Sequence, residues 1–255
     1  MNPLKCHPFP VQAHFRQSLV LTFAMPLAQL AARLPEPLSP DTLNGARAFV
    51  AVAMVQTENL RPKGFPAWAG NDFFLAGYRI FVRYTNRSGK RLRGLYILES
   101  QTDKRKMELL GNLMTHYNYT RIEVEQAFGE EEGVRTYSVS SISEGFAVKV
   151  RYEDDPGLPA GSPFSGWKEA RRFAGPLPFT FTYDANSRRM LIVEGVRQNW
   201  TPRPVTVESF TMPWLARRGF DEAVLASAFV VEDIPYFWKR GVLERWTRNP
   251  AATII

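Results

Sequence analysis

Three adjacent cations, Lys104, Arg105 and Lys106, are the residues best suited to covalent chemistry in this sequence. A neighbouring positive charge disfavours a protonated ammonium group and lowers its pKa, and a lysine activated in this way forms a Schiff base with a carbonyl substrate at neutral pH. The same residues follow Thr102-Asp103, a pair typical of a helix N-cap, so they also fit a first helical turn whose charges lie in water. Cations in that turn face the positive end of the helix dipole and do not favour the helix. The sequence leaves both interpretations open.

A polar and aromatic cluster follows, at His116, Tyr117, Asn118 and Tyr119. It stands just before a predicted strand, where successive side chains point to opposite faces. His116 and Asn118 would then face one way, and Tyr117 and Tyr119 the other. Such side chains either line a ligand pocket or have their polar groups satisfied at the edge of the core. His116 and Tyr117 are therefore candidate ligand contacts.

Two arginines, Arg16 and Arg79, lie within or beside apolar segments that fit strands. A guanidinium group there needs a partner of opposite charge, because burying an unpaired charge is costly. That partner is a carboxylate either of the protein or of a bound ligand. Since the chain carries a net charge of +7 in scattered groups, its surface attracts small anionic metabolites. Both arginines are therefore also candidate ligand contacts.

Several functional classes lack their sequence signature. The spacing of Cys6, His7 and His14 matches no established metal-ligand pattern, so no metal site is expected. No Gly-x-Ser-x-Gly, Gly-x-Gly-x-x-Gly or phosphate-loop motif is present, which argues against a serine hydrolase and against a nucleotide cofactor. The cations form no continuous block, so nucleic acid is not the expected partner. We expect no cofactor.

Alternating and β-branched runs dominate the chain and predict strands. Hairpin turns are expected at residues 86–89 and 184–187, each between two such runs. Helical spacing is confined to short segments, of which 104–114 is the clearest. The predicted strands cover residues 18–24, 46–55, 78–85, 92–99, 120–126, 134–140, 146–152, 179–183, 190–193, 205–210 and 229–233, and the predicted helices 26–34, 104–114, 166–173 and 221–227.

These elements predict one mostly β domain, of the α+β class, over residues 1–255. Short strands separated by turns favour an antiparallel, closed or nearly closed barrel with a few peripheral helices. A chain of 255 residues is at the upper end of what one hydrophobic core can hold, which fits a single domain.

Composition also predicts compartment and partners. The longest apolar stretch, residues 19–32, contains Pro26 and Gln29 and is too short to span a bilayer, so no membrane partner is expected. The one cysteine, Cys6, excludes an intramolecular disulfide and fits a reducing compartment, which indicates a cytoplasmic protein. The aromatic tail at residues 236–238 offers a surface to another subunit, so a homo-oligomer is a further expectation.

The order of several segments resembles the acetoacetate decarboxylase superfamily, and within it a branch of uncharacterised bacterial proteins with a domain of unknown function. The segments are 21–24, 30–38 (LAARLPEPL), 47–54, 58–62 (ENLRP), 78–83 (YRIFVR), 95–100 (LYILES), 116–121 (HYNYTR) and, more loosely, 199–204. The resemblance implies a cone-shaped antiparallel barrel with an interior active site. It also implies decarboxylation of a β-keto acid, in which a lysine forms a Schiff base and a neighbouring lysine lowers its pKa.

The family's catalytic residues carry over only in part. By resemblance, Arg16 falls on the arginine proposed to meet the substrate carboxylate, and Glu99 falls near the glutamate that precedes the lysine pair. An ungapped match places Arg105 on the Schiff-base lysine and Lys106 on its neighbour, and arginine cannot form the imine. A shift of one residue would place Lys104 there instead. Val50 replaces a buried acidic residue of the decarboxylase.

The sequence therefore predicts a barrel protein that binds a small anionic ligand in its interior, without the family's intact Schiff-base site. Arg16, Arg79, His116 and Tyr117 are its predicted ligand contacts, and Arg16 is expected to face the interior or its mouth. The alternative is a keto-acid decarboxylase or related lyase that uses Lys104 or Lys106 as the Schiff-base lysine, with Glu99 as a further catalytic residue.

Overall fold

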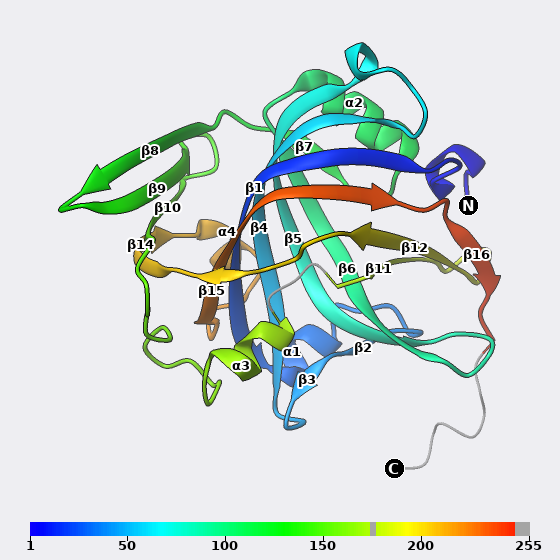
Figure 1. The fold of residues 1–255 in the computed structure, drawn as a ribbon. Coiled ribbons are helices and arrows are strands. Elements are labelled where there is room, and N and C mark those ends of the chain that lie inside the picture. Colours follow the sequence, from blue (N-terminus) through cyan, green and yellow to red (C-terminus); the bar gives the residue numbers. More distant parts are fainter. Residues whose placement is uncertain (174–176, 248–255) are drawn as a thin grey trace.

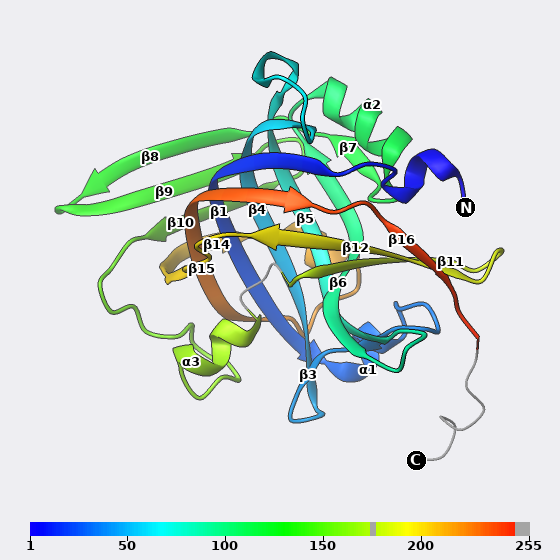
Figure 2. The same cartoon turned by 45° about the vertical axis from the view of Figure 1, so that its right-hand side comes forward.

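The computed structural model describes residues 1–173 and 177–247. A large sheet winds into a ring, and a smaller four-stranded sheet projects from one side of it (Figures 1 and 2). Within the described residues, the ring runs through β15, β1, β4, β5, β6, β11 and β12, and pairing between β12 and β15 closes it. The bounds are β1 Val11–Pro26, β4 Arg47–Pro62, β5 Asn71–Thr85, β6 Arg91–Thr102, β11 Phe179–Asp184, β12 Arg189–Arg197 and β15 Val224–Trp238.

The pairing pattern confirms the prediction of a mostly β, closed or nearly closed sheet with few helices. β1 pairs antiparallel with both β4 and β15 along most of its length. The closing contact is short and joins Gly195 to Trp238 and Arg197 to Tyr236. One contact in the ring, between β6 and β11, is parallel, which the sequence did not predict.

The remaining elements lie around this ring. The smaller sheet has the order β14, β10, β9 and β8, with bounds Thr206–Thr211, Phe146–Arg151, Val134–Ser141 and Glu125–Glu131. Short strands add to the large sheet at β2 Ser39–Pro40, β3 Thr42–Leu43, β7 Tyr119–Arg121, β13 Arg203–Pro204 and β16 Val242–Arg245. The helices are α1 Leu27–Ala31, α2 Arg105–Met114, α3 Trp167–Ala170 and α4 Pro213–Arg217, with 3-10 turns η1 Pro3–Cys6, η2 Ala67–Ala69 and η3 Arg171–Phe173. No helix in the described part of the chain is long and apolar enough to cross a bilayer.

The long central strands are apolar on both faces because each face packs against its own core. On β4 the odd-numbered side chains from Phe49 to Val55 face the interior of the ring. The even-numbered ones from Ala48 to Met54 face outward, where α4 and the smaller sheet cover them. In the sequence, strands buried on both faces appear as continuous apolar runs rather than as alternating apolar and polar residues.

One end of the ring is covered by three separate segments. α2 lies across this end, the N-terminal arm with η1 lies on one side of it, and the turn that carries η2 lies on the other (Figures 1 and 2). α2 also contacts η1 and β7 directly. These segments position the side chains of the candidate site.

The expected helix at residues 221–227 is wrong. β15 begins at Val224 within this range, and α4 instead lies earlier, at Pro213–Arg217. The side chains from Leu225 to Val231 are buried on both faces of β15, so tertiary packing overrides the local helical spacing. The expected strand at residues 229–233 is part of this longer strand.

Candidate functional site

A cavity of about 320 Å³ lies inside the ring at the end covered by α2. Its walls are mostly apolar and come from the inner faces of β1, β4, β5 and β6, from α2, and from the N-terminal arm at His7 to Phe9. Enclosed apolar cavities with a few convergent polar groups are typical ligand sites. The polar groups in its walls include Arg79, Ser100, Tyr117, Tyr119, Thr180 and Tyr236.

Arg79 is one of two arginines among the described residues that line this cavity, and the other, Arg61, donates to the backbone carbonyls of Asn59 and Phe65. The Arg79 side chain rises from the inner face of β5, and its Nε is buried without a hydrogen-bond partner. No carboxylate among the described residues forms an ion pair with it. Burial lowers the pKa of this guanidinium, and the hydroxyls of three nearby tyrosines oppose the shift. An enclosed guanidinium without a counter-charge is costly to the fold and is therefore available to an anion.

Three other arginines, Arg83, Arg93 and Arg218, do have carboxylate partners. Arg83 and Arg93 both donate to Asp41, whose side chain is fully buried, over 2.5 and 2.6 Å. Arg218 donates to Glu99 on the outside of the ring. Arg79 therefore differs from them in its missing counter-charge rather than in its burial alone.

Tyr117, Tyr119 and Tyr236 surround Arg79. Burial raises the pKa of Tyr119 to about 12 and also raises the pKa of Tyr117 and of Tyr236 above the ordinary phenol value. All three phenols therefore remain protonated at neutral pH. The cavity offers an oxyanion the positive charge of Arg79 together with neutral hydroxyl donors.

Glycines make room for this cluster. A Cβ added at Gly77 would lie 2.6 Å from an Nη of Arg79, so the guanidinium lies back over its own strand. A Cβ at Gly111 of α2 would lie 2.4 Å from the Tyr119 ring, and one at Gly195 would lie 2.2 Å from the Tyr236 hydroxyl. Glycine inside a strand often marks such a close approach. The backbone is therefore shaped around Arg79, Tyr119 and Tyr236.

The lysines proposed for Schiff-base chemistry lie outside the cavity. Lys104 is the N-cap of α2, and its Nζ lies 3.2 Å from Asp103 at the surface. Arg105 and Lys106 are exposed on the first turn of the helix. The helix turns Met107 and Gly111 inward instead, and none of the described residues that line the cavity is a lysine.

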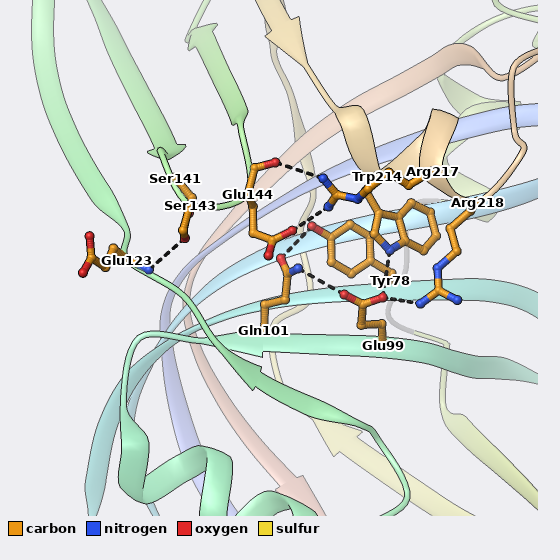
Figure 3. A network of polar contacts seen from close by, with 10 residues as sticks. All are labelled: Tyr78, Glu99, Gln101, Glu123, Ser141, Ser143, Glu144, Trp214, Arg217 and Arg218. Carbon is orange, nitrogen blue, oxygen red and sulfur yellow. Dashed lines mark hydrogen bonds and ion pairs between the residues drawn. The ribbon is translucent and has the colours of Figure 1, made fainter.

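Glu99 lies on the opposite face of the sheet from the cavity. A β-bulge shifts the pairing of β5 with β6 between Tyr78 and Arg79, so that Ile97 and Ser100 face inward while Glu99 faces outward. There it accepts hydrogen bonds from Gln101, from the Trp214 indole at 3.1 Å and from Arg218 (Figure 3). These contacts hold α4 against the ring.

The four predicted ligand contacts divide into two pairs. Arg79 and Tyr117 line the cavity, as the sequence predicted for a ligand site. His116 does not line it; its side chain is partly buried, and burial lowers its pKa. Arg16 was expected to face the interior, but it is 67% exposed and lies 3.8 Å from Glu58. The reason is local, because Phe15 takes the inward position and a bulge follows between Phe15 and Gln17.

Sequence reasoning did not select Tyr119 or Tyr236 as ligand contacts. Tyr119 belonged to the recognised cluster, and its alternation with His116 was the available signal. Tyr236 was read as part of a surface for another subunit. Its place in the cavity wall depends on the pairing of β15 with β1 and β12, and both contacts join strands far apart in the chain.

Comparison with known proteins gives a family and a fold. The DUF2071 family, described as an uncharacterised conserved protein, matches residues 12–239. The chain belongs to the DUF2071 family. No curated protein shows significant similarity to its sequence.

Three solved structures share the fold of this DUF2071 protein at low identity. An acetoacetate decarboxylase-like enzyme from Sphingomonas wittichii RW1 has a TM-score of 0.57 at 14% identity and covers 96% of this chain and 94% of its own. Acetoacetate decarboxylase from Legionella pneumophila has a TM-score of 0.58 at 12% identity, over 93% and 88%. The enduracididine biosynthesis enzyme MppR, complexed with the condensation product of pyruvate and imidazole 4-carboxaldehyde, has a TM-score of 0.54 at 11% identity, over 92% and 89%. These neighbours confirm the expected acetoacetate decarboxylase-like fold, and the family match agrees with the expected uncharacterised branch.

Proposed function

We propose that this protein binds a small carboxylate with an apolar body in the cavity inside the ring. The carboxylate lies against the guanidinium of Arg79 and accepts hydrogen bonds from the surrounding tyrosine hydroxyls. The apolar body packs against the cavity walls, which come from Phe15, Leu75, Leu95 and Ile97 among others. A charged hydrogen bond to the ligand contributes about 1.5–3 kcal/mol, and the apolar walls supply affinity without direction.

One observation carries this proposal, namely that Arg79 is enclosed without a carboxylate partner among the described residues. Arg83, Arg93 and Arg218 each meet an aspartate or glutamate. Arg197, whose pKa burial also lowers, lies over the Trp200 ring and is not among the residues that line the cavity. Because Arg79 has no carboxylate partner among the described residues, its charge is suited to a ligand that carries a negative charge. The pyruvate-derived product bound to MppR makes small keto acids reasonable first candidates within this class.

We propose binding without Schiff-base chemistry as the function of this cavity. An imine requires a lysine whose Nζ reaches the bound carbonyl, and the cavity walls contain no lysine among the described residues. The lyase alternative would need Lys104 or Lys106 to turn inward from the exposed first turn of α2. Binding therefore has stronger support than decarboxylation.

The proposal is tested by comparing an acid with its amide. Phenylacetate and phenylacetamide have nearly the same shape, and only the first carries a charge. Titration calorimetry at pH 7.5 should give an affinity for phenylacetate that is roughly 10- to 100-fold higher. Equal affinity for the two compounds would contradict the role of Arg79, and the same titration with pyruvate tests a smaller body.

A further inference from the structure

Exposed apolar side chains surround the end of the ring at which the cavity reaches the surface. This apolar rim consists of Phe9 from the N-terminal arm, Phe65 and Trp68 from the turn between β4 and β5, and Leu109, Leu110 and Leu113 from α2. Phe9 and Leu110 also line the cavity. Figures 1 and 2 both place α2 between the other two segments. A gathered set of this kind marks an interaction site, because isolated exposed apolar residues are common but clusters are not.

The two most exposed side chains of the apolar rim are a tryptophan in the turn between β4 and β5 and a leucine on the outward face of α2. Trp68 is 87% exposed and Leu109 is 70% exposed. Leu109 and Leu113 are four residues apart and therefore neighbours on the outward face of α2. An outward helix face would ordinarily be polar, while here both faces of α2 are apolar along its second half. The fold itself does not explain this face.

The first turn of α2 adds positive charge to the apolar rim. Arg105 and Lys106 are exposed, and neither has an ion-pair partner among the described residues. Their position faces the positive end of the helix dipole, which costs rather than contributes stability. The three adjacent cations are not used by the cavity, since none of them lines it. Lys104 pairs with Asp103, whereas the placement of Arg105 and Lys106 is not explained by contacts within the described residues.

We propose that the apolar rim docks this protein on the surface of a lipid bilayer that contains anionic lipids. Apolar side chains enter the interface to a depth of about 5–10 Å while basic residues meet the head groups, and tryptophan is favoured at that level. The cavity then opens toward the lipid, so its ligand is an amphiphilic carboxylate drawn from there; this last step rests on the proposed function. The sequence predicted no membrane partner because it has no spanning segment, and surface docking requires none.

Charge favours a lipid surface over a second copy of the chain. Two copies that met rim to rim would bring Arg105 and Lys106 of each molecule toward the same cations of the other. Like charges brought together at an interface oppose association. A bilayer with anionic head groups instead attracts them, by about 1 kcal/mol for each lysine or arginine near the surface.

Co-sedimentation with vesicles tests this proposal on the full chain. Vesicles of phosphatidylcholine and phosphatidylglycerol at 7:3 should bind the wild-type protein, and vesicles of phosphatidylcholine alone should bind it more weakly. The double variant Arg105→Ser/Lys106→Ser should lose roughly fivefold in partitioning for each cation removed. Trp68→Ser and Leu109→Ser/Leu113→Ser should each weaken binding to both kinds of vesicle.

A matched control removes exposed apolar groups elsewhere. Phe128→Ser/Ile142→Ser changes two exposed side chains, one on β8 of the smaller sheet and one in the turn between β9 and β10, and should bind vesicles like the wild type. Absence of wild-type binding, or equal losses in the control, overturns the proposal. A wild-type oligomer that the rim variants convert to monomer, seen by light scattering after gel filtration, also overturns it and assigns the rim to a second copy. Arg79→Met should lose phenylacetate and still bind vesicles, so failure of the docking and failure of the proposed function are distinguishable.

Discussion

Two neighbouring residues of β5, Tyr78 and Arg79, point to opposite faces of one sheet and enter two different polar clusters. On the outer face, Tyr78 donates to Gln101, which donates in turn to Glu99, and Glu99 also accepts from Trp214 and Arg218 (Figure 3). Each charge in that cluster has a partner. On the inner face, Arg79 has three neutral tyrosines near it and no carboxylate among the described residues.

The difference teaches how one sheet separates stability from binding. A satisfied buried network fixes the packing of the elements it joins, and removing one member leaves the others unpaired. An unsatisfied buried charge lowers the stability of the free protein, and a ligand with the opposite charge removes that penalty. The outer cluster should therefore respond to mutation through unfolding, and the inner cluster through affinity.

The largest expected effect is on the outer cluster. Glu99→Ala removes the acceptor for the Trp214 indole, the Gln101 amide and the Arg218 guanidinium. We expect the free energy of unfolding to fall by roughly 2–4 kcal/mol, measured by urea denaturation. Phenylacetate affinity should remain unchanged. Glu194→Ala is the control, since it breaks only the exposed pair with Lys239 and should cost less than about 1 kcal/mol.

The substitution Gly77→Ala perturbs the inner cluster rather than the outer one. The new Cβ would lie 2.6 Å from the Arg79 guanidinium, which must move because it is the flexible end of its side chain. Phenylacetate affinity should fall about tenfold while urea unfolding changes little. Gly157→Ala is a matched control, because a Cβ there meets nothing within 4 Å. A large loss of stability with full affinity would place Gly77 in the packing of the sheet alone.

The stability of the protein at high pH tests whether the tyrosines of the inner cluster are buried as neutral phenols. The folded protein holds the pKa of Tyr119 at about 12, whereas the unfolded chain releases the same proton near 10. The stability linked to this proton is present below pH 10 and is lost as pH rises toward 12. By pH 11 the loss is about 1.4 kcal/mol, which Tyr119→Phe should abolish. Urea unfolding at pH 8 and pH 11 measures it, and identical pH dependence of the two proteins would show that Tyr119 is not shielded.

The smallest expected effect is in covalent trapping, where we expect no reaction. Borohydride added with acetoacetate should produce no covalent adduct, because the exposed first turn of α2 keeps Lys104 and Lys106 away from the cavity. Intact-mass spectrometry followed by peptide mapping checks this. A mass increase on either lysine would support the lyase alternative and would show that α2 can rearrange.

The fold was largely predictable because strand patterns are local. Apolar runs and turn signals located the strands of the ring, and the order of weak segments such as 30–38 and 58–62 indicated the fold that the solved neighbours share. The prediction of a helix at residues 221–227 was wrong, because β15 begins at Val224 and its side chains are buried on both faces of the sheet. Local spacing does not encode that packing.

The lining of the candidate site was predictable only where a single residue type indicated it. Arg79 was found because a charge inside an apolar strand needs a partner. Arg16 was expected to face the interior, and a β-bulge, which leaves no mark in the sequence, changes the inward register by one residue there. A second bulge turns Glu99, the further catalytic residue of the lyase alternative, away from the cavity. Tyr236 was not selected as a candidate because pairings between distant strands bring it into the cavity wall.

The most direct test of the central claim is the response of one variant in two measurements. Arg79→Met removes the unpaired charge and keeps an apolar side chain of similar length. Phenylacetate affinity should fall roughly 10- to 100-fold, while the free energy of unfolding stays the same or rises. Arg16→Met, on the exposed side of β1, should change neither quantity. An Arg79→Met protein that unfolds more easily and binds phenylacetate as tightly as the wild type would contradict the account.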